Sequence, residues 1–160
     1  MINTKDALMT FSEELTKKMI LRGVTHRQVA FAARVTRESM SRYKNGVCFP
    51  RLWTMVLIAD YLKCGVSELL GYSDGLSLSH EYNAARLYTN EDIFIDYFRD
   101  KLTQQMRIEH VNSEQLAEKS DLSLKDVKMY LSIHRWIPTV PEFLHICSAL
   151  NCTPSDLLGY

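Results

Sequence analysis

The chain has 160 residues, of which 46% are hydrophobic and 24% charged, a composition typical of one folded domain or of two small ones. Its formal net charge is zero, which argues against a general coat for nucleic acid. No apolar run approaches the roughly 18 residues of a membrane-spanning helix, and the N-terminal stretch lacks the apolar core of a secretion signal. We therefore expect a cytoplasmic protein with no membrane partner.

The N-terminal part of the sequence predicts three helices in succession. The first begins at Asn3 or Thr4 and ends at Gly23, because Asn and Thr are common N-cap residues and Gly commonly follows a helix. The second begins after Thr25, and the third is capped by Thr36. No convincing alternating strand pattern accompanies them, so the sequence favours an all-α fold.

Two shorter helices are predicted to follow. Pro50 marks the first turn of the fourth helix, since proline is tolerated there and disrupts a helix further along. A fifth, brief helix started by Ser67 lies within the sequence VSELLGY. Residues 1–72 are thus expected to form one small helical domain.

Residues 73–89 read SDGLSLSHEYNAARLYT. The first part is rich in serine and turn-forming residues, whereas HEYNAARLY can form two helical turns. Several leucines and tyrosines make the segment more apolar than a free linker. We expect it to pack against one or both neighbouring domains.

The C-terminal half repeats the N-terminal half. Matching residues lie 87 positions apart, as Asn3 and Asn90 do, and then 88 positions apart, as Pro50 and Pro138 do. The two copies end in SELLGY and SDLLGY. Apolar matches recur at helical spacing, and they include Phe11/Phe98, Leu15/Leu102 and Met19/Met106. The sequence therefore predicts two tandem five-helix domains, residues 1–72 and 90–160.

The helices of the second copy are predicted from the same signals. They start at Asn90, after Asn112, at Ser123, at Pro138 and at Ser155. Asn90 is followed by two acids, which favour the first turn of a helix.

The charges are distributed unevenly between the copies. Residues 1–80 hold eleven basic and seven acidic side chains, and residues 81–160 hold eight and twelve. The stretch from Arg22 to Arg51 contains seven basic residues and a single acidic residue, Glu38. A local basic stretch of this kind is what phosphate binding requires.

Residues 24–46 read VTHRQVAFAARVTRESMSRYKNG and predict two short helices held at a fixed angle. Val29 and Ala30 face inward from the first helix, and Met40 and Tyr43 face inward from the second. The outward face of the second helix then consists of Arg37, Glu38, Ser39, Arg42 and Lys44. A helix of this kind can enter the major groove of DNA, which is about 12 Å wide.

The stretch resembles the helix-turn-helix of the lambda-repressor-like (Cro/XRE) DNA-binding family. The matching residues are Thr25, Val29, Ala30, Val35, Thr36, Met40, Ser41, Asn45, Gly46, Pro50, Leu57, Ile58, Ala59, Leu62, Leu69 and Leu70. The resemblance departs at Arg34, where the family usually has glycine in the turn. A positive φ there would cost about 1 kcal/mol relative to glycine, and the alternative is a turn of different construction.

The resemblance implies roles for individual residues. Arg37 and Arg42 would donate to guanine, and Glu38 would accept from cytosine. Thr36 would cap the helix and contact a phosphate. The positions that hold the DNA backbone are His26, Arg27, Lys44 and Asn45. The alternative is that all of these are solvated polar side chains on an exposed helix.

The second copy keeps the inward residues and changes the outward ones. At the three base-reading positions it has Leu124, Lys125 and Met129. These residues supply little of the charge that neutralises phosphates. We instead expect an exposed apolar patch that serves self-association or a protein partner, formed by Leu124, Met129, Leu131 and Trp136.

Two alternatives remain for the second copy. Its apolar residues can pack against residues 73–89 of the same chain. Both copies can also bind DNA, in which case one chain would act as its own pseudo-dimer.

The sequence thus predicts a sequence-specific regulator of transcription, a repressor, that reads double-stranded DNA with the helix at 36–44 and forms a homodimer. The alternative is a protein-interaction module, such as an antitoxin-like or inhibitor protein. We do not expect an enzyme, because the sequence shows no nucleophile–base set, no phosphate loop and no paired catalytic carboxylates at a meaningful spacing. The four cysteines form no CxxC pair and the five histidines are scattered, so we expect free thiols, no metal and no cofactor.

Overall fold

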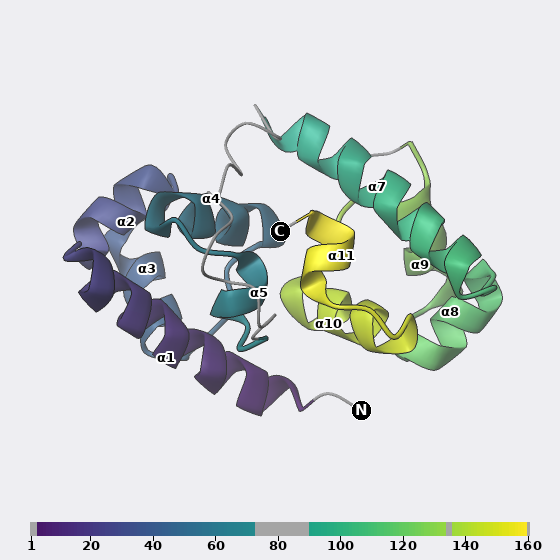
Figure 1. Cartoon of the computed structure of the whole chain (residues 1–160), viewed down its shortest axis with the longest axis horizontal. Coiled ribbons are helices and arrows are strands. Elements are labelled where there is room, and N and C mark those ends of the chain that lie inside the picture. Colours follow the sequence, from purple (N-terminus) through teal and green to yellow (C-terminus); the bar gives the residue numbers. More distant parts are fainter. Residues whose placement is uncertain (1–2, 73–89, 134–135, 160) are drawn as a thin grey trace. The chain divides into compact units, whose positions relative to one another are not determined.

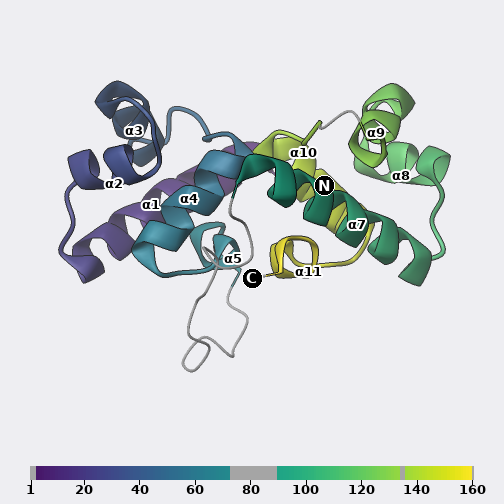
Figure 2. The same cartoon turned by 90° about the horizontal axis from the view of Figure 1, so that it is seen from above.

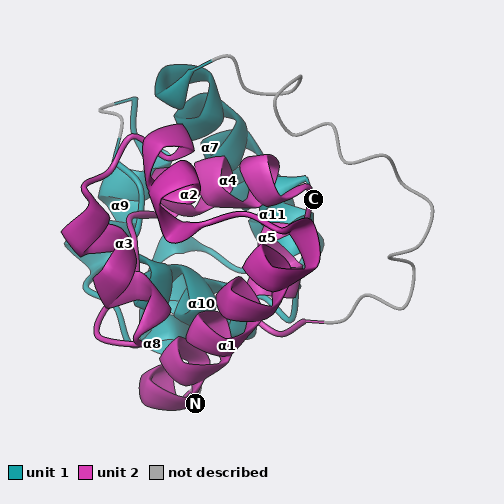
Figure 3. Cartoon of the chain, turned by 90° about the vertical axis from the view of Figure 1, so that its left-hand side faces the viewer, with its two compact units in different colours: residues 1–2, 86–159 teal, residues 3–85, 160 magenta. Residues whose placement is uncertain are grey.

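A computed structural model of the chain describes residues 3–72, 90–133 and 136–159. They form two compact units, here called the N-terminal domain (3–72, within the magenta unit of Figure 3) and the C-terminal domain (the described residues from 90 to 159, within the teal unit). All regular elements among these residues are helices, which confirms the all-α prediction. The prediction for residues 73–89 lies outside the described residues.

The N-terminal domain has five helices in the order expected from the sequence (Figure 1). They are α1 (Thr4–Arg22), α2 (His26–Ala32), α3 (Arg37–Lys44), α4 (Leu52–Leu62) and α5 (Val66–Leu69). The first three are capped by Asn3, Thr25 and Thr36, whose side chains accept backbone N–H groups of the first turn. Gly23 ends α1 in the left-handed region, at φ 64°. The predicted bounds of these helices are confirmed.

The C-terminal domain repeats this order. Its helices are α7 (Glu91–Ile108), α8 (Ser113–Ser120), α9 (Leu124–Leu131), α10 (Val140–Ala149) and α11 (Pro154–Leu158). The side chains of Asn90, Asn112 and Ser123 cap α7, α8 and α9, as predicted. Phe98 and Leu102 are as completely buried as their counterparts Phe11 and Leu15. The two domains therefore have the same kind of core.

The predicted starts of the fourth helices were wrong by a few residues. The N-cap of α4 is Arg51, so Pro50 precedes the helix. In the C-terminal domain Thr139 is the N-cap, Pro138 precedes it, and the first-turn proline is Pro141. Proline suits both places, because its fixed φ fits an extended residue as well as a first helical turn.

The predicted serine starts of the fifth helices were also wrong. Ser67 and Ser155 lie inside α5 and α11, whose N-caps are Gly65 and Thr153. An acid three residues after each cap accepts its backbone N–H: Glu68 from Gly65 at 3.0 Å, and Asp156 from Thr153 at 2.7 Å. The acids, and not the serines, mark these helix starts.

Within the N-terminal domain, α2 packs against α3 and α4, and α1 contacts α3, α4 and α5. Figure 2 shows α2 and α3 next to each other at one end of this domain. Met40, the inward residue of α3, is fully buried, as are Leu15 of α1 and Met55 of α4. The core thus fixes α3 through one face and leaves the opposite face to solvent.

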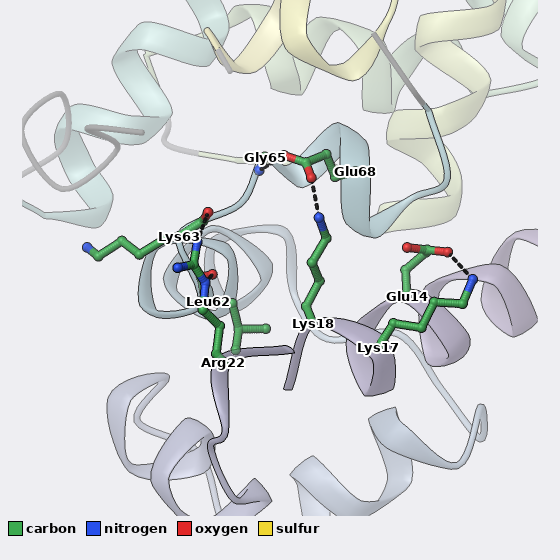
Figure 4. Close-up of polar contacts among 8 residues, drawn as sticks. All are labelled: Glu14, Lys17, Lys18, Arg22, Leu62, Lys63, Gly65 and Glu68. Atoms are coloured by element: carbon green, nitrogen blue, oxygen red, sulfur yellow. Dashed lines mark hydrogen bonds and ion pairs between the residues drawn. The ribbon is translucent and has the colours of Figure 1, made fainter. Parts of the chain in front are cut away.

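Polar contacts attach the C-terminal end of α1 to the segment between α4 and α5 (Figure 4). Arg22 donates from Nε to the carbonyl oxygen of Leu62 at 2.8 Å and from Nη2 to that of Lys63 at 3.0 Å. Lys18 forms an ion pair with Glu68. The guanidinium therefore satisfies carbonyl groups that the end of α4 leaves without helical partners. We call these contacts the α1–α5 clamp.

The C-terminal domain holds the same place together with amides. Gln105, at the position of Lys18, donates from Nε2 to the carbonyl oxygen of Leu150 at 3.4 Å. Asn151 donates from Nδ2 to Glu109 at 3.4 Å. The end of the first helix is thus attached by charged side chains in the N-terminal domain and mainly by side-chain amides in the C-terminal domain.

We predict that Glu68→Gln destabilises the N-terminal domain in a pH-dependent way. Burial raises the pKa of Glu68. The Gly65 N–H, Lys18 and Arg22 together lower that pKa by more than burial raises it, so the net pKa lies below the usual 4.5. The ionised carboxylate therefore contributes stability above about pH 4.5, and this contribution is lost as the pH falls through the lowered pKa. Thermal melts should show a loss of about 1 kcal/mol or less at pH 7 that shrinks in acid.

Glu14→Gln is the matched control, because its partner Lys17 is exposed and the pair lies three residues apart on α1. Its effect should be smaller at every pH. An equal loss for Glu68→Gln at pH 3 and pH 7 would contradict the role of the charge.

Candidate nucleic-acid interface

Helix α2 and the turn after it are fixed by local hydrogen bonds. Thr25 and Gln28 form a capping box, in which the Gln28 N–H donates to Thr25 Oγ1 at 3.3 Å and the Thr25 N–H to Gln28 Oε1 at 2.8 Å. At the other end, the Val35 N–H donates to the carbonyl oxygen of Ala30 at 3.0 Å. Arg34 adopts φ 57°, so the turn has the positive φ that the first of the two alternatives required.

Helix α3 is anchored at both ends and along one face. Thr36 Oγ1 accepts the Ser39 N–H at 3.1 Å and donates to Ser39 Oγ at 2.9 Å. Met40 is fully buried, and Ser12 of α1 donates from Oγ to the carbonyl oxygen of Lys44 at 2.5 Å. Rotation of α3 would expose Met40 and break the Ser12–Lys44 hydrogen bond, and the Thr36 cap fixes where the helix begins, so its outward residues have fixed positions.

Nearly all of the predicted DNA-contacting residues are exposed. The nine residues lie on α2, on α3 or at the caps of α3, and the two helices pack against each other. Ser39 is half-buried, and the exposed ones are His26, Arg27, Thr36, Arg37, Glu38, Arg42, Lys44 and Asn45. Their assignment to DNA contact stays a prediction.

The cations of the N-terminal domain fall into two groups. In the C-terminal half of α1 and after α4 they have partners, since Lys17 pairs with Glu14 at 2.6 Å and Lys63 with Asp60 at 3.7 Å, whereas Lys5 near the start of α1 has no ion pair within the described residues. In the α2–α3 region, no ion pair formed within the described residues involves Arg27, Arg34, Arg37, Arg42 or Lys44. Five positive charges therefore lie on this surface with Glu38 as the acid among them.

The corresponding surface of the C-terminal domain carries acids with local partners. Glu114, at the position of Arg27, lies 3.8 Å from Lys128 of α9. Asp126, at the position of Ser39, accepts the hydroxyl of Ser123 at 2.6 Å. Burial raises the pKa of Tyr130, and Glu142 and Asp126 beside it raise it further. The surface is charge-balanced, where its N-terminal counterpart is strongly positive.

The predicted apolar patch of the C-terminal domain is only partly exposed. Leu124 and Trp136 are 36% and 56% exposed, whereas Met129 and Leu131 are half-buried. Leu131 lines a shallow cleft of about 690 Å³ together with residues of α7 and α8. Sequence reasoning missed Ile133, which is 80% exposed. Its position in the sequence between Leu131 and Trp136, two residues assigned to the patch, could have indicated that Ile133 belongs to the same patch.

No group of three or more potential metal ligands occurs in the part of the chain that the structure describes. All four cysteines are free thiols. Burial, followed by the nearby Glu68, raises the pKa of Cys64 to about 12, so this thiol is protonated and unreactive at neutral pH. Among the described helices, none has the length and hydropathy needed to span a membrane.

We predict that Thr36→Ala lowers the free energy of unfolding of the N-terminal domain by about 1 kcal/mol, because α3 loses its side-chain cap. Thr36→Ser and Thr36→Asp retain an oxygen that can accept the Ser39 N–H, so they should melt like the parent protein. Ser123→Ala is the matched change in the C-terminal domain and should cost a similar amount. A Thr36→Ala protein that melts like the parent would show that the cap is not formed in solution.

Comparison with known proteins gives one match. The family profile described as the Cro/C1-type HTH DNA-binding domain matches residues 14–75 and, a second time, residues 101–160. The matched ranges contain α2 and α3 in the first copy and α8 and α9 in the second. No curated protein and no solved structure matches the chain.

Proposed function

The chain belongs to the Cro/C1-type HTH DNA-binding family, with two copies of the domain, and we propose that it is a transcriptional repressor whose N-terminal copy reads the operator. The unpaired cations of α2 and α3, which are Arg27, Arg37, Arg42 and Lys44, carry this proposal. Cations without internal partners can displace counterions from DNA at no cost in broken ion pairs. Binding of the N-terminal domain to an operator would then block polymerase sterically.

In this proposal α3 enters the major groove. Arg37 and Arg42 donate to guanine O6 and N7, and Glu38 accepts from cytosine N4. The backbone contacts come from His26, Arg27, Thr36, Lys44 and Asn45 at the edges of the two helices, with Ser39 beside Thr36. The buried face of α3 supports this arrangement, because a reading helix must be held rigidly against its own domain.

The C-terminal domain, residues 90–160, has a different role in the proposal. Its Glu114 and Asp126 lie where the N-terminal domain has Arg27 and Ser39, and acids there repel phosphates. We assign to it the pairing of two chains into a homodimer through the exposed Leu124 and Trp136 and the half-buried Met129 and Leu131. Two N-terminal domains could then occupy two half-sites of one operator.

We predict that Arg37→Ala and Arg42→Ala each weaken binding to the preferred duplex by roughly 1–3 kcal/mol and relax the preference for one base pair. The preferred duplex is selected from a random library with the full-length protein. Melting should not change, because both side chains are exposed and unpaired.

Lys125→Ala, on the equivalent face of α9, is the control and should leave the affinity for DNA unchanged. Normal affinity and specificity in both arginine variants would exclude α3 as the reading helix. The absence of any enriched duplex would instead favour a protein-interaction module, antitoxin-like or inhibitory, and would direct attention to the C-terminal domain.

We further predict that the double change Leu124→Ser and Trp136→Ser converts the dimer to a monomer in analytical ultracentrifugation. The variant should bind a single half-site like the parent and lose most of the gain from a second half-site. Ile20→Ser removes an even more exposed apolar side chain from α1 and should not affect the dimer. A parent protein that is monomeric at all concentrations would refute this interface.

A further inference from the structure

We infer that Arg34, in the turn between α2 and α3, is an additional DNA contact of the N-terminal domain and binds a backbone phosphate. The inference rests on the proposed function. It starts from the backbone of Arg34, whose φ of 57° lies in the left-handed region that favours glycine. An arginine at this position therefore reduces the stability of the fold relative to glycine.

The turn itself explains why φ must be positive there. The Arg34 N–H donates to the carbonyl oxygen of Phe31 at 3.2 Å, and the Val35 N–H donates to that of Ala30 at 3.0 Å. These two bonds end α2 and direct the chain toward the cap of α3. Neither bond uses the side chain of residue 34, so glycine would form the same turn.

The side chain of Arg34 forms no stabilising polar contact with the described residues of its own domain. It is exposed, and within the described residues its guanidinium has no ion pair or hydrogen bond. Lys63 also has a positive φ, of 53°, but its ammonium lies 3.7 Å from Asp60 and its carbonyl oxygen accepts from Arg22. An unfavourable backbone without an internal contact points to an external role.

The second copy gives an internal comparison. Asp121 occupies the equivalent turn with the same φ of 57°, and the Leu122 N–H donates to the carbonyl oxygen of Ala117 at 3.0 Å. Aspartate tolerates the left-handed region better than most residues do. The copy with the basic surface thus has a costly cation in this turn, and the other copy has a tolerated anion.

The position of Arg34 favours a phosphate over a base edge. It lies two residues before Thr36, the cap of α3, and therefore outside the helix that would occupy the groove. A guanidinium at the edge of such a helix can donate two N–H groups to one phosphate. The contact would add to affinity for any sequence and would not select among bases.

Arg34→Gly tests the inference because it should move stability and affinity in opposite directions. We expect a higher melting temperature together with a roughly 3- to 10-fold loss of affinity, equal for the selected duplex and for a random-sequence duplex. The slope of log affinity against log salt should decrease in magnitude by about one. Arg34→Lys should retain most of that slope.

Asp121→Gly is the matched control, which should also raise the melting temperature and leave DNA affinity unchanged. Wild-type affinity and salt slope in Arg34→Gly, with weakened binding in Arg42→Ala, would overturn the inference and leave the proposed function intact. A loss of affinity accompanied by a lower melting temperature would also overturn it, because the role would then be structural. Failure of the parent protein to bind any duplex would overturn both.

Discussion

The burial of one face of α3 determines how this chain can act. Met40 is fully buried, and Ser12 holds the carbonyl oxygen of Lys44 from α1. These two contacts fix the helix at its middle and its end. The outward side chains therefore have defined directions although they take no part in fixing the helix. The outward positions can therefore change freely, and the two copies differ most there. Val127 occupies the place of Met40 and is equally buried beneath a different surface.

The sequence predicted the fold where the decisive contacts are local. Side-chain caps such as Thr25 and Thr36 act within one helical turn, so the starts of the first three helices of each domain were correct. It failed for α5, because the N-cap there is a glycine, which has no side-chain oxygen, and the local signal is instead Glu68, which accepts the Gly65 N–H from three residues further on. It also misplaced the start of α4, because Pro50 is compatible with either side of a helix boundary.

For the candidate site, the sequence predicted which side chains of α3 are buried and which are exposed. Helical periodicity correctly separated Met40 from the exposed Arg37 and Arg42, since that division needs only the period of a helix. The same periodicity placed Leu131 on an exposed patch, whereas it is half-buried beside α7, a contact between segments remote in sequence. The conformation of Arg34 was also left open, because the hydrogen bonds of the turn, and not its own preference, impose the positive φ.

The α1–α5 clamp and the amide contacts at the corresponding place in the C-terminal domain differ in their response to ionic strength. In the N-terminal domain the Lys18–Glu68 ion pair joins α1 to α5, while in the C-terminal domain the amides of Gln105 and Asn151 join the end of α7 to the residues just after α10. Mobile ions weaken partly exposed ion pairs and leave hydrogen bonds from neutral amides nearly unchanged. A rise in salt therefore weakens this contact in the N-terminal domain as it also shields the cationic surface of that domain, and it weakens the corresponding amide contacts of the C-terminal domain less. The same connection in two similar domains thus depends on ionic strength in one copy and much less in the other.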